Sequence, residues 1–185
     1  DNKIFKVEAL RSLTLAGRYR EKKKDLKPLN RTLFVTTGYI HRENEFQLKL
    51  LKDAERLDGL KKYSKILIKP HPYMPVETIM ESLKFEFQYE ITHLPLADLW
   101  ANVDVLYCAN STAICSEAAW LGFPVIVAGS LNEFNLNPLF GFADIEFMTN
   151  ASMLAEKLQN PIPMDIPEEY FYLDKDLNRW VELLK

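Results

Sequence analysis

The stretch DVLYCANSTAICSEAAWLGFPVIVAG, residues 104–129, carries the pattern that decides the fold. A short apolar run reaches Asn110, the next part has the composition of a helix over Thr112–Leu121, and a second apolar run begins at Pro124. Two buried strands joined by a helix need a crossover connection, so this stretch predicts two parallel strands of one sheet.

The same alternation of short β-branched runs and amphipathic stretches begins at Thr32. Strands are predicted over Thr32–Thr37, Lys65–Lys69, Phe85–Ile91, Asp104–Cys108, Val125–Ala128 and, more weakly, Glu146–Met148. Helices are predicted over Glu43–Leu57, Pro75–Leu83, Pro95–Ala101 and Thr112–Leu121, the second and third with proline in the first turn. This alternation predicts an α/β fold built on a parallel sheet.

The composition favours a folded protein and argues against nucleic acid as a partner. Of the 185 residues 48% are hydrophobic, and 23 basic residues against 26 acidic ones give a net charge of −3, without the basic excess of nucleic-acid binders. No apolar run reaches the roughly 18 residues that span a bilayer, and the first residues lack the apolar core of a secretory signal. We therefore expect a cytoplasmic protein, working in solution or at the inner face of the membrane.

Three parts are expected along the chain: a connecting segment over residues 1–30, a nucleotide-binding domain over 31–160, and an extension over 161–185. The first includes the basic cluster Arg20–Lys24, which we interpret as a solvated face. The last ends in a predicted helix over Asp174–Lys185, capped by Asp174, whose apolar face should pack back on the body. Because position 1 is Asp, we expect the chain to be a piece of a longer protein.

Two cysteines, Cys108 and Cys115, flank the predicted turn after the fourth strand. Both lie in apolar surroundings, and a reducing compartment keeps such thiols reduced. The sequence therefore favours two buried free thiols over a disulfide.

The first candidate site is ILIKPHP, residues 66–72, where a predicted strand runs directly into Lys69 and His71. Ligands of open parallel sheets bind at the carboxyl ends of the strands, and the prolines on both sides of His71 restrict its backbone. Lysine and histidine together suit an anion. The alternative is a purely structural histidine at the end of a strand.

The second candidate site is formed by Asn110, Ser111 and Thr112, at the predicted N-terminus of the following helix. Backbone N–H groups at such a terminus bind phosphate, although Ser111 as a simple helix cap explains the pattern equally well. Glu117, among alanines of the same helix, is predicted either to bind a ribose diol or to be an exposed helix residue.

The third candidate is TTGYIHREN, residues 36–44, in which Gly38 would let the backbone approach a ligand closely. His93 is a weaker candidate beside a nucleoside base, with an exposed turn residue as the alternative. The loop after the fifth predicted strand offers polar groups toward a sugar, at Asn132, Glu133, Asn135 and Asn137.

These motifs resemble the C-terminal half of bacterial GT-B glycosyltransferases of surface-polysaccharide synthesis, which include sialyltransferases, Kdo transferases and CDP-glycerol transferases. The resemblance covers residues 32 to about 160. Lys69–Pro72 (KPHP) is similar to the family's His-Pro motif, and Asn110–Thr112 to its Ser/Thr motif. The run Glu117–Val125 (EAAWLGFPV) is similar to a segment found more widely among GT-B proteins.

The resemblance implies a Rossmann-like three-layer domain, the C-terminal half of a GT-B fold, that binds a pyrimidine-nucleotide sugar donor. The phosphate of this donor would be contacted by Lys69, His71, Ser111 and Thr112, and His71 is the candidate catalytic residue. Gly38 and Asn110 would also bind the donor, and Glu117 would bind its ribose. It also implies a glycan acceptor and a general base in an N-terminal domain of the full-length protein, so this chain would bind the donor without transferring it. No metal and no cofactor are expected, since the helix dipole and basic side chains stabilise the departing phosphate in such enzymes.

Two alternatives remain open at this stage. One is a nucleotide-sugar epimerase of GT-B fold, against which the absence of a Gly-rich turn at Asn110–Thr112 counts. The other is a noncatalytic flavodoxin-like binding module, because fold alone does not define function.

Overall fold

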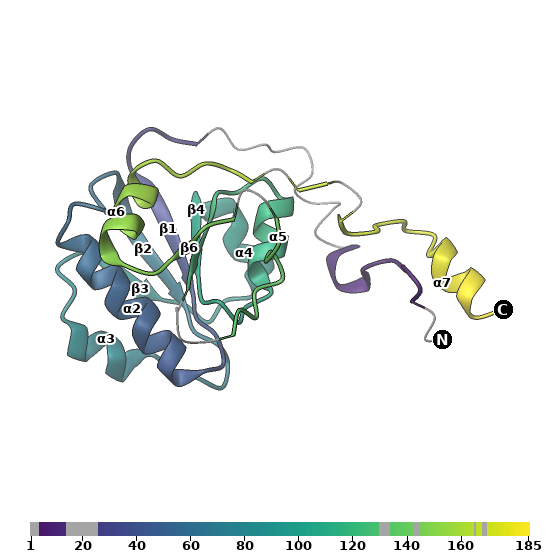
Figure 1. The fold of residues 1–185 in the computed structure, drawn as a ribbon, viewed down its shortest axis with the longest axis horizontal. Coiled ribbons are helices and arrows are strands. Elements are labelled where there is room, and N and C mark those ends of the chain that lie inside the picture. Colours follow the sequence, from purple (N-terminus) through teal and green to yellow (C-terminus); the bar gives the residue numbers. More distant parts are fainter. Residues whose placement is uncertain (1–3, 14–25, 130–133, 143–144, 165, 168–169) are drawn as a thin grey trace.

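The computed structural model describes residues 4–13, 26–129, 134–142, 145–164, 166–167 and 170–185. Within them, six parallel strands form one sheet in the order β3-β2-β1-β4-β5-β6. The strands are β1 (Arg31–Thr36), β2 (Tyr63–Lys69), β3 (Tyr89–Ile91), β4 (Val105–Cys108), β5 (Val125–Ala128) and β6 (Phe147–Met148). The predicted α/β fold with a parallel sheet is confirmed (Figure 1).

Helices cover both faces of the sheet and make three layers (Figure 1). The helices are α2 (His41–Glu55), α3 (Glu77–Leu83), α4 (Leu96–Leu99), α5 (Ile114–Trp120), α6 (Ala151–Gln159) and α7 (Asn178–Leu183), with 3₁₀ turns η1 (Leu10–Ser12) and η2 (Trp100–Asn102). On β1, Leu33 and Val35 pack in the core under α2, α3 and α6, whereas Phe34 faces the opposite core with Trp100. This alternation follows from the two-residue period of a strand and leaves β1 buried on both faces.

Several predicted boundaries differ from those observed. The third strand is shorter than predicted, because the N–H groups of Glu86 and Phe87 donate to Glu55 on α2, at 3.1 and 2.6 Å, and leave the ladder. Pro75 and Pro95 precede the first turns of α3 and α4 instead of lying in them. The sequence interpretation contained no helix at α6, although Asn150 caps it by accepting from the Met153 N–H at 3.0 Å.

The C-terminal helix lies beside the N-terminal segment (Figure 1). Glu8 accepts hydrogen bonds from the N–H groups of Arg179 and Trp180, at 3.1 and 3.2 Å, and no residue of α7 is buried. The predicted packing of this helix on the body is therefore not observed: its long-range hydrogen bonds among the described residues run to Glu8. Asp174 does not cap the helix as predicted, because the N-cap is Leu177; the Asp174 carboxylate accepts from the Asp176 N–H and from the side chain of Asn178, the first residue of α7. The basic cluster Arg20–Lys24 lies outside the described residues.

Candidate functional site

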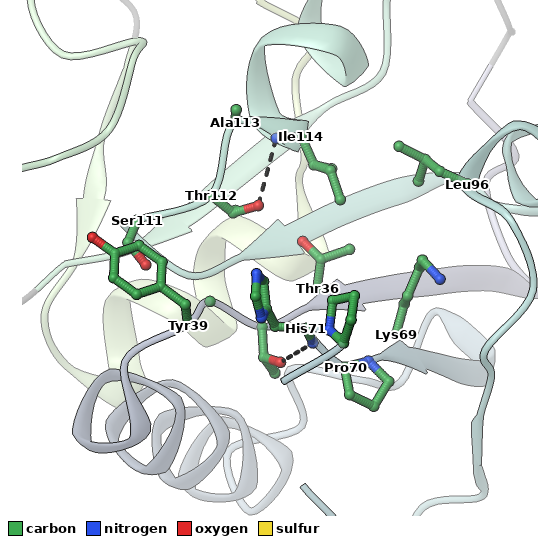
Figure 2. A pocket seen from close by; sticks show the side chains of 13 residues that line it. Thr36, Tyr39, Lys69, Pro70, His71, Leu96, Ser111, Thr112, Ala113 and Ile114 are labelled. Atoms are coloured by element: carbon green, nitrogen blue, oxygen red, sulfur yellow. Dashed lines mark hydrogen bonds between the residues drawn. The ribbon is translucent and has the colours of Figure 1, made fainter. Parts of the chain in front are cut away.

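A cavity of about 390 Å³ opens at the carboxyl ends of β2, β1 and β4, which are neighbours in the sheet. The chain runs from β1 outward to β3 and then returns to β4 on the other side, so the point between β1 and β4 is where the strand order reverses. Crevices at such reversals are where α/β sheets bind ligands. The lining residues are Thr36, Thr37, Gly38, Tyr39, Lys69, Pro70, His71, Pro72, Leu96, Ser111, Thr112, Ala113 and Ile114 (Figure 2).

The turn after β2 fixes the orientation of His71. Its backbone N–H donates to Thr37 Oγ1 at 3.2 Å, and its carbonyl accepts from the Met74 N–H at 2.9 Å. The Tyr73 N–H points to His71 Nδ1 at 3.4 Å. In the neutral ring Nδ1 is then the acceptor and Nε2 carries the proton, which makes Nε2 a hydrogen-bond donor for a ligand.

Two tyrosine rings flank His71. The ring centre of Tyr39 lies 6.2 Å from that of His71, and the ring of Tyr73 lies 5.9 Å away on the turn after β2. Both tyrosines are exposed, Tyr73 by 86%. The imidazole therefore has two aromatic neighbours, of which Tyr39 also lines the cavity.

Lys69 lies on the side of the cavity next to Leu96 (Figure 2). Its ammonium group donates to the Leu94 carbonyl at 2.7 Å. Partial burial of the side chain lowers the pKa of Lys69 below its ordinary value. An ammonium group has three donors, so this lysine retains further donors for an anion.

The Ser111 hydroxyl does not cap α5, which corrects the alternative considered from the sequence. The carboxylate of buried Glu43 accepts both the Ser111 N–H, at 2.7 Å, and the Ser111 hydroxyl. The helix begins at Ile114, two residues later than predicted, with Ala113 as its N-cap. Thr112 Oγ1 faces the first turn and accepts from the Ile114 N–H at 3.5 Å.

Gly38 is held in place by a single side chain. Asn44 accepts from the Gly38 N–H at 2.8 Å and donates to its carbonyl at 2.9 Å. A Cβ at position 38 would lie 2.9 Å from Glu43 Oε2 and closer still to Ser111 Oγ. Glycine is therefore required at this position by the close approach of the loops after β1 and β4.

Two predicted site residues lie outside the cavity lining. Asn110 is buried, donates from Nδ2 to the Phe134 carbonyl at 3.2 Å, and accepts on its own carbonyl from Asn137 at 3.3 Å. These bonds connect the end of β4 to the loop after β5. Glu117 is buried on α5, so the alternative of an exposed helix glutamate is wrong, and its contact with a ribose stays a prediction.

The structure also describes His93, Asn135 and the two cysteines. His93 is exposed and does not line the cavity. Asn135 accepts from the Asn137 N–H at 3.0 Å, while Asn132 and Glu133 lie outside the described residues. The two cysteines are buried free thiols, as predicted.

The residues missed by the sequence interpretation belong to the support of the site. Thr36 was treated only as part of a strand, and Glu43 and Asn44 only as part of a polar turn and helix. A signal was present, because Glu43, Asn44 and Gln47 are spaced to share one helix face and all three are buried in α2. Buried polar side chains need partners, and these partners are the strand ends at Gly38, Thr36 and Ser111.

Among the residues that the structure describes, no group of three or more histidines, cysteines or carboxylates is arranged to hold a metal ion. The sequence contains one Asp-x-Asp triplet, Asp174–Asp176, in the C-terminal segment and away from the cavity lining. The absence of a metal in the reaction stays a prediction. None of the helices in the described part of the chain has the length and apolar character needed to cross a membrane.

Comparison with known proteins identifies the fold. No protein-family model matches the chain, and no curated protein is similar to it in sequence. Among solved structures, it is similar to UDP-GlcNAc 2-epimerase from Methanocaldococcus jannaschii in complex with UDP-GlcNAc and UDP, with a TM-score of 0.63 and 15% identity over 99% of this chain and 55% of that chain.

A wall teichoic acid polymerase and a glucosyltransferase are also similar in structure. The wall teichoic acid polymerase TagF aligns with a TM-score of 0.56 and 14% identity, over 82% of this chain and 39% of that one. The catalytic domain of cholesterol-α-glucosyltransferase from Helicobacter pylori aligns with a TM-score of 0.52 and 24% identity, over 69% of this chain and 84% of that one. The chain thus has the Rossmann-like fold of a GT-B half, and it spans about half or less of the epimerase and the polymerase.

Proposed function

We propose that this chain is the donor-binding domain of a glycosyltransferase of GT-B fold, and that its cavity binds a pyrimidine-nucleotide sugar. The observation that carries the proposal is the convergence of Gly38, His71 and Thr112 from three neighbouring strands at the point where the strand order reverses. These residues were selected from the sequence as three separate motifs, and they line one cavity.

The chemistry of the lining supports a phosphate ligand. His71 Nε2, the Lys69 ammonium and the Thr112 hydroxyl are donors, and the carboxylate of Glu43 behind the lining is bound by Ser111. Cationic and neutral donors favour an anion, and none of the described lining residues carries a carboxylate. The apolar side chains of Leu96 and Ile114 at the other side suit the less polar part of a nucleotide.

The proposed reaction needs more than this cavity. In this proposal the acceptor glycan and the general base are supplied by an N-terminal domain of the full-length protein, and the product is a surface or capsule carbohydrate made on the cytoplasmic side. His71 would act on the departing phosphate, either as a hydrogen-bond donor or as an acid, without a metal.

The test is nucleotide binding by this chain. Melting temperature is measured with CMP, CDP, UDP, GDP and ADP for the wild type, His71→Ala and His93→Ala. A ligand at 100 times its Kd stabilises the native state by about 2.7 kcal/mol, which corresponds to roughly 5–10 °C for a chain of this size. We expect a pyrimidine nucleotide to give such a shift in the wild type and in His93→Ala, the exposed-histidine control, and a much smaller one in His71→Ala. No shift with any nucleotide contradicts the proposal and favours the noncatalytic module.

An epimerase of GT-B fold is the second candidate, favoured by the extent of the structural match to UDP-GlcNAc 2-epimerase. The turn Asn110–Thr112 without glycine argues against it. A strong preference for UDP over CMP and CDP, together with epimerised sugar after incubation of the full-length protein with UDP-GlcNAc, would favour the epimerase over the transferase.

A further inference from the structure

Thr36, the last residue of β1, places a hydroxyl in the wall of the cavity without a partner. The residue is 1% exposed, and none of the residues in the described part of the chain makes a hydrogen bond to its Oγ1. Figure 2 shows Thr36 between the side chain of His71 and those of Thr112 and Ile114. Buried hydroxyls are almost always hydrogen-bonded, so an unpaired one in a cavity wall points to a ligand.

The backbone of Thr36 is fixed in the sheet. The Thr36 carbonyl accepts from Gln47 Nε2 at 3.1 Å and from the Ala109 N–H at 3.0 Å, and β1 is paired on both sides, with β2 and β4. The strand therefore cannot shift to give Thr36 Oγ1 a protein partner, and in the observed rotamer the hydroxyl has none among the described residues. Valine has nearly the same shape and an equal preference for strands, so packing alone does not explain threonine here.

The neighbours of Thr36 define what it would bind. Ser111 directs its hydroxyl hydrogen to Glu43, so its oxygen faces the cavity only as an acceptor. Donors around the cavity include His71 Nε2, the Thr112 hydroxyl and the Lys69 ammonium. A hydroxyl added to this set best serves a group with several acceptor oxygens, which is the chemistry of a phosphate.

We propose that Thr36 is a ligand-binding residue whose hydroxyl donates a hydrogen bond to a phosphate oxygen of the bound nucleotide. The inference rests on the proposed function and deepens it, since it assigns to Thr36 the hydroxyl role that the sequence suggested for Ser111. Ser111 then serves as a hydrogen-bond acceptor that Glu43 orients.

The experiment compares Thr36→Val with Thr32→Val. Both substitutions exchange a hydroxyl for a methyl group on the same face of β1, but Thr32 is half-buried at the opposite end of the strand and does not line the cavity. Melting temperature without ligand and the Kd of the nucleotide that stabilises the wild type are measured for the three proteins, the Kd by calorimetry.

Thr36→Val should melt at the same temperature as the wild type or higher, because it removes an unpaired buried hydroxyl. Its Kd should rise roughly 10- to 100-fold, the effect of losing one hydrogen bond to a charged group, while Thr32→Val keeps the wild-type Kd. A Kd of Thr36→Val within twofold of the wild type overturns the inference and leaves a buried water as the partner of this hydroxyl. Weaker binding that comes with a matching loss of melting temperature also counts against it.

A second titration distinguishes failure of the proposed function from failure of the assignment of Thr36. If no nucleotide stabilises the wild type, the same three proteins are titrated with inorganic pyrophosphate. Binding of pyrophosphate that Thr36→Val weakens supports an anion site without a nucleotide function. Absence of pyrophosphate binding, or binding that Thr36→Val leaves unchanged, refutes the assignment of Thr36 as well.

Discussion

The carboxylate of Glu43 accepts both the backbone N–H and the side-chain hydroxyl of Ser111, and thereby joins the first turn of α2 to the loop after β4. The two residues are far apart in the sequence and come from the two halves of the sheet, on either side of the reversal between β1 and β4. Charge-assisted hydrogen bonds of this kind are stronger than neutral ones. The pair therefore stabilises the geometry of the cavity, with Ser111 in the lining and Glu43 behind it.

Replacement of Glu43 should measure this support. Glu43→Ala removes the acceptor of two partly buried donors of Ser111, and we expect the free energy of unfolding to fall by about 1–3 kcal/mol. Glu43→Gln keeps one acceptor oxygen, so its free energy of unfolding should fall by less. Urea unfolding followed by circular dichroism gives both values.

Glu45→Gln on the same helix is the matched control for Glu43. Its carboxylate lies 3.7 Å from His41 Nδ1, with both side chains more than half exposed. Exposed pairs contribute little, so a change within about 0.5 kcal/mol is expected. Equal losses of unfolding free energy at positions 43 and 45 would show that the bonds to Ser111 do not contribute to stability.

Gly38→Ala should damage the cavity by steric contact. The added Cβ would lie 2.9 Å from Glu43 Oε2 and nearer to Ser111 Oγ, so one of the two loops must shift, at a cost of about 1–3 kcal/mol. We expect weaker nucleotide binding, and partial recovery in the double variant Gly38→Ala, Ser111→Ala, where the closest atom is gone. Gly122→Ala is the control, because its φ of +83° strains the backbone in open space far from the cavity lining. A loss of binding in Gly122→Ala equal to that in Gly38→Ala contradicts the steric explanation.

Much of the fold could be predicted from the sequence, because buried parallel strands have a strong local signature. The fifth predicted strand, Val125–Ala128, matches β5 residue for residue, and the others overlap their strands. The prediction was less accurate where tertiary contacts act on the backbone. Glu55 binds the N–H groups before β3, which therefore do not join the ladder. Glu43 binds Ser111, so the alternative in which Ser111 caps the helix is wrong.

The location of the site could be predicted from the sequence, but the hydrogen-bond partners of its side chains could not. Strand ends with turn residues pointed to Gly38, His71 and Thr112, since parallel strands bring their carboxyl ends to one edge. The role of Thr36 depends on the absence of a partner for its hydroxyl, which no sequence pattern reveals. The same holds for Asn110, whose side chain bonds to the loop after β5 instead of lining the cavity.

The two thiols should resist labelling in the folded protein. Cys108 and Cys115 are both fully buried, and burial raises the pKa of the Cys108 thiol well above its usual value. A thiol reagent needs an accessible thiolate, so labelling should follow unfolding. With Ellman's reagent we expect no fast phase in native buffer and two thiols per chain in denaturant without reductant. Two unreactive sulfurs in denaturant would indicate a disulfide and contradict the free thiols.

Anion binding should depend on pH through Lys69. Burial lowers the pKa of Lys69 in the free chain, because desolvation disfavours the charged ammonium. A bound phosphate stabilises the ammonium and raises that pKa, so binding takes up a proton wherever the free lysine is neutral. Affinity is therefore full below the lowered pKa and falls as pH rises through it.

The affinity for the nucleotide should begin to decline at a lower pH than it would with an exposed lysine. In Lys69→Gln the affinity should be lower and should stay constant over the same alkaline range. Lys65→Gln is the control: Lys65 lies on the same strand, but its ammonium pairs with Glu90 at 2.5 Å on the surface. Calorimetric titrations of the stabilising nucleotide at increasing pH, in buffers of different ionisation enthalpy, give both the affinity and the proton uptake. Unchanged pH dependence in Lys69→Gln would mean that the ammonium stays with the Leu94 carbonyl and that the phosphate is bound by His71 and the hydroxyls.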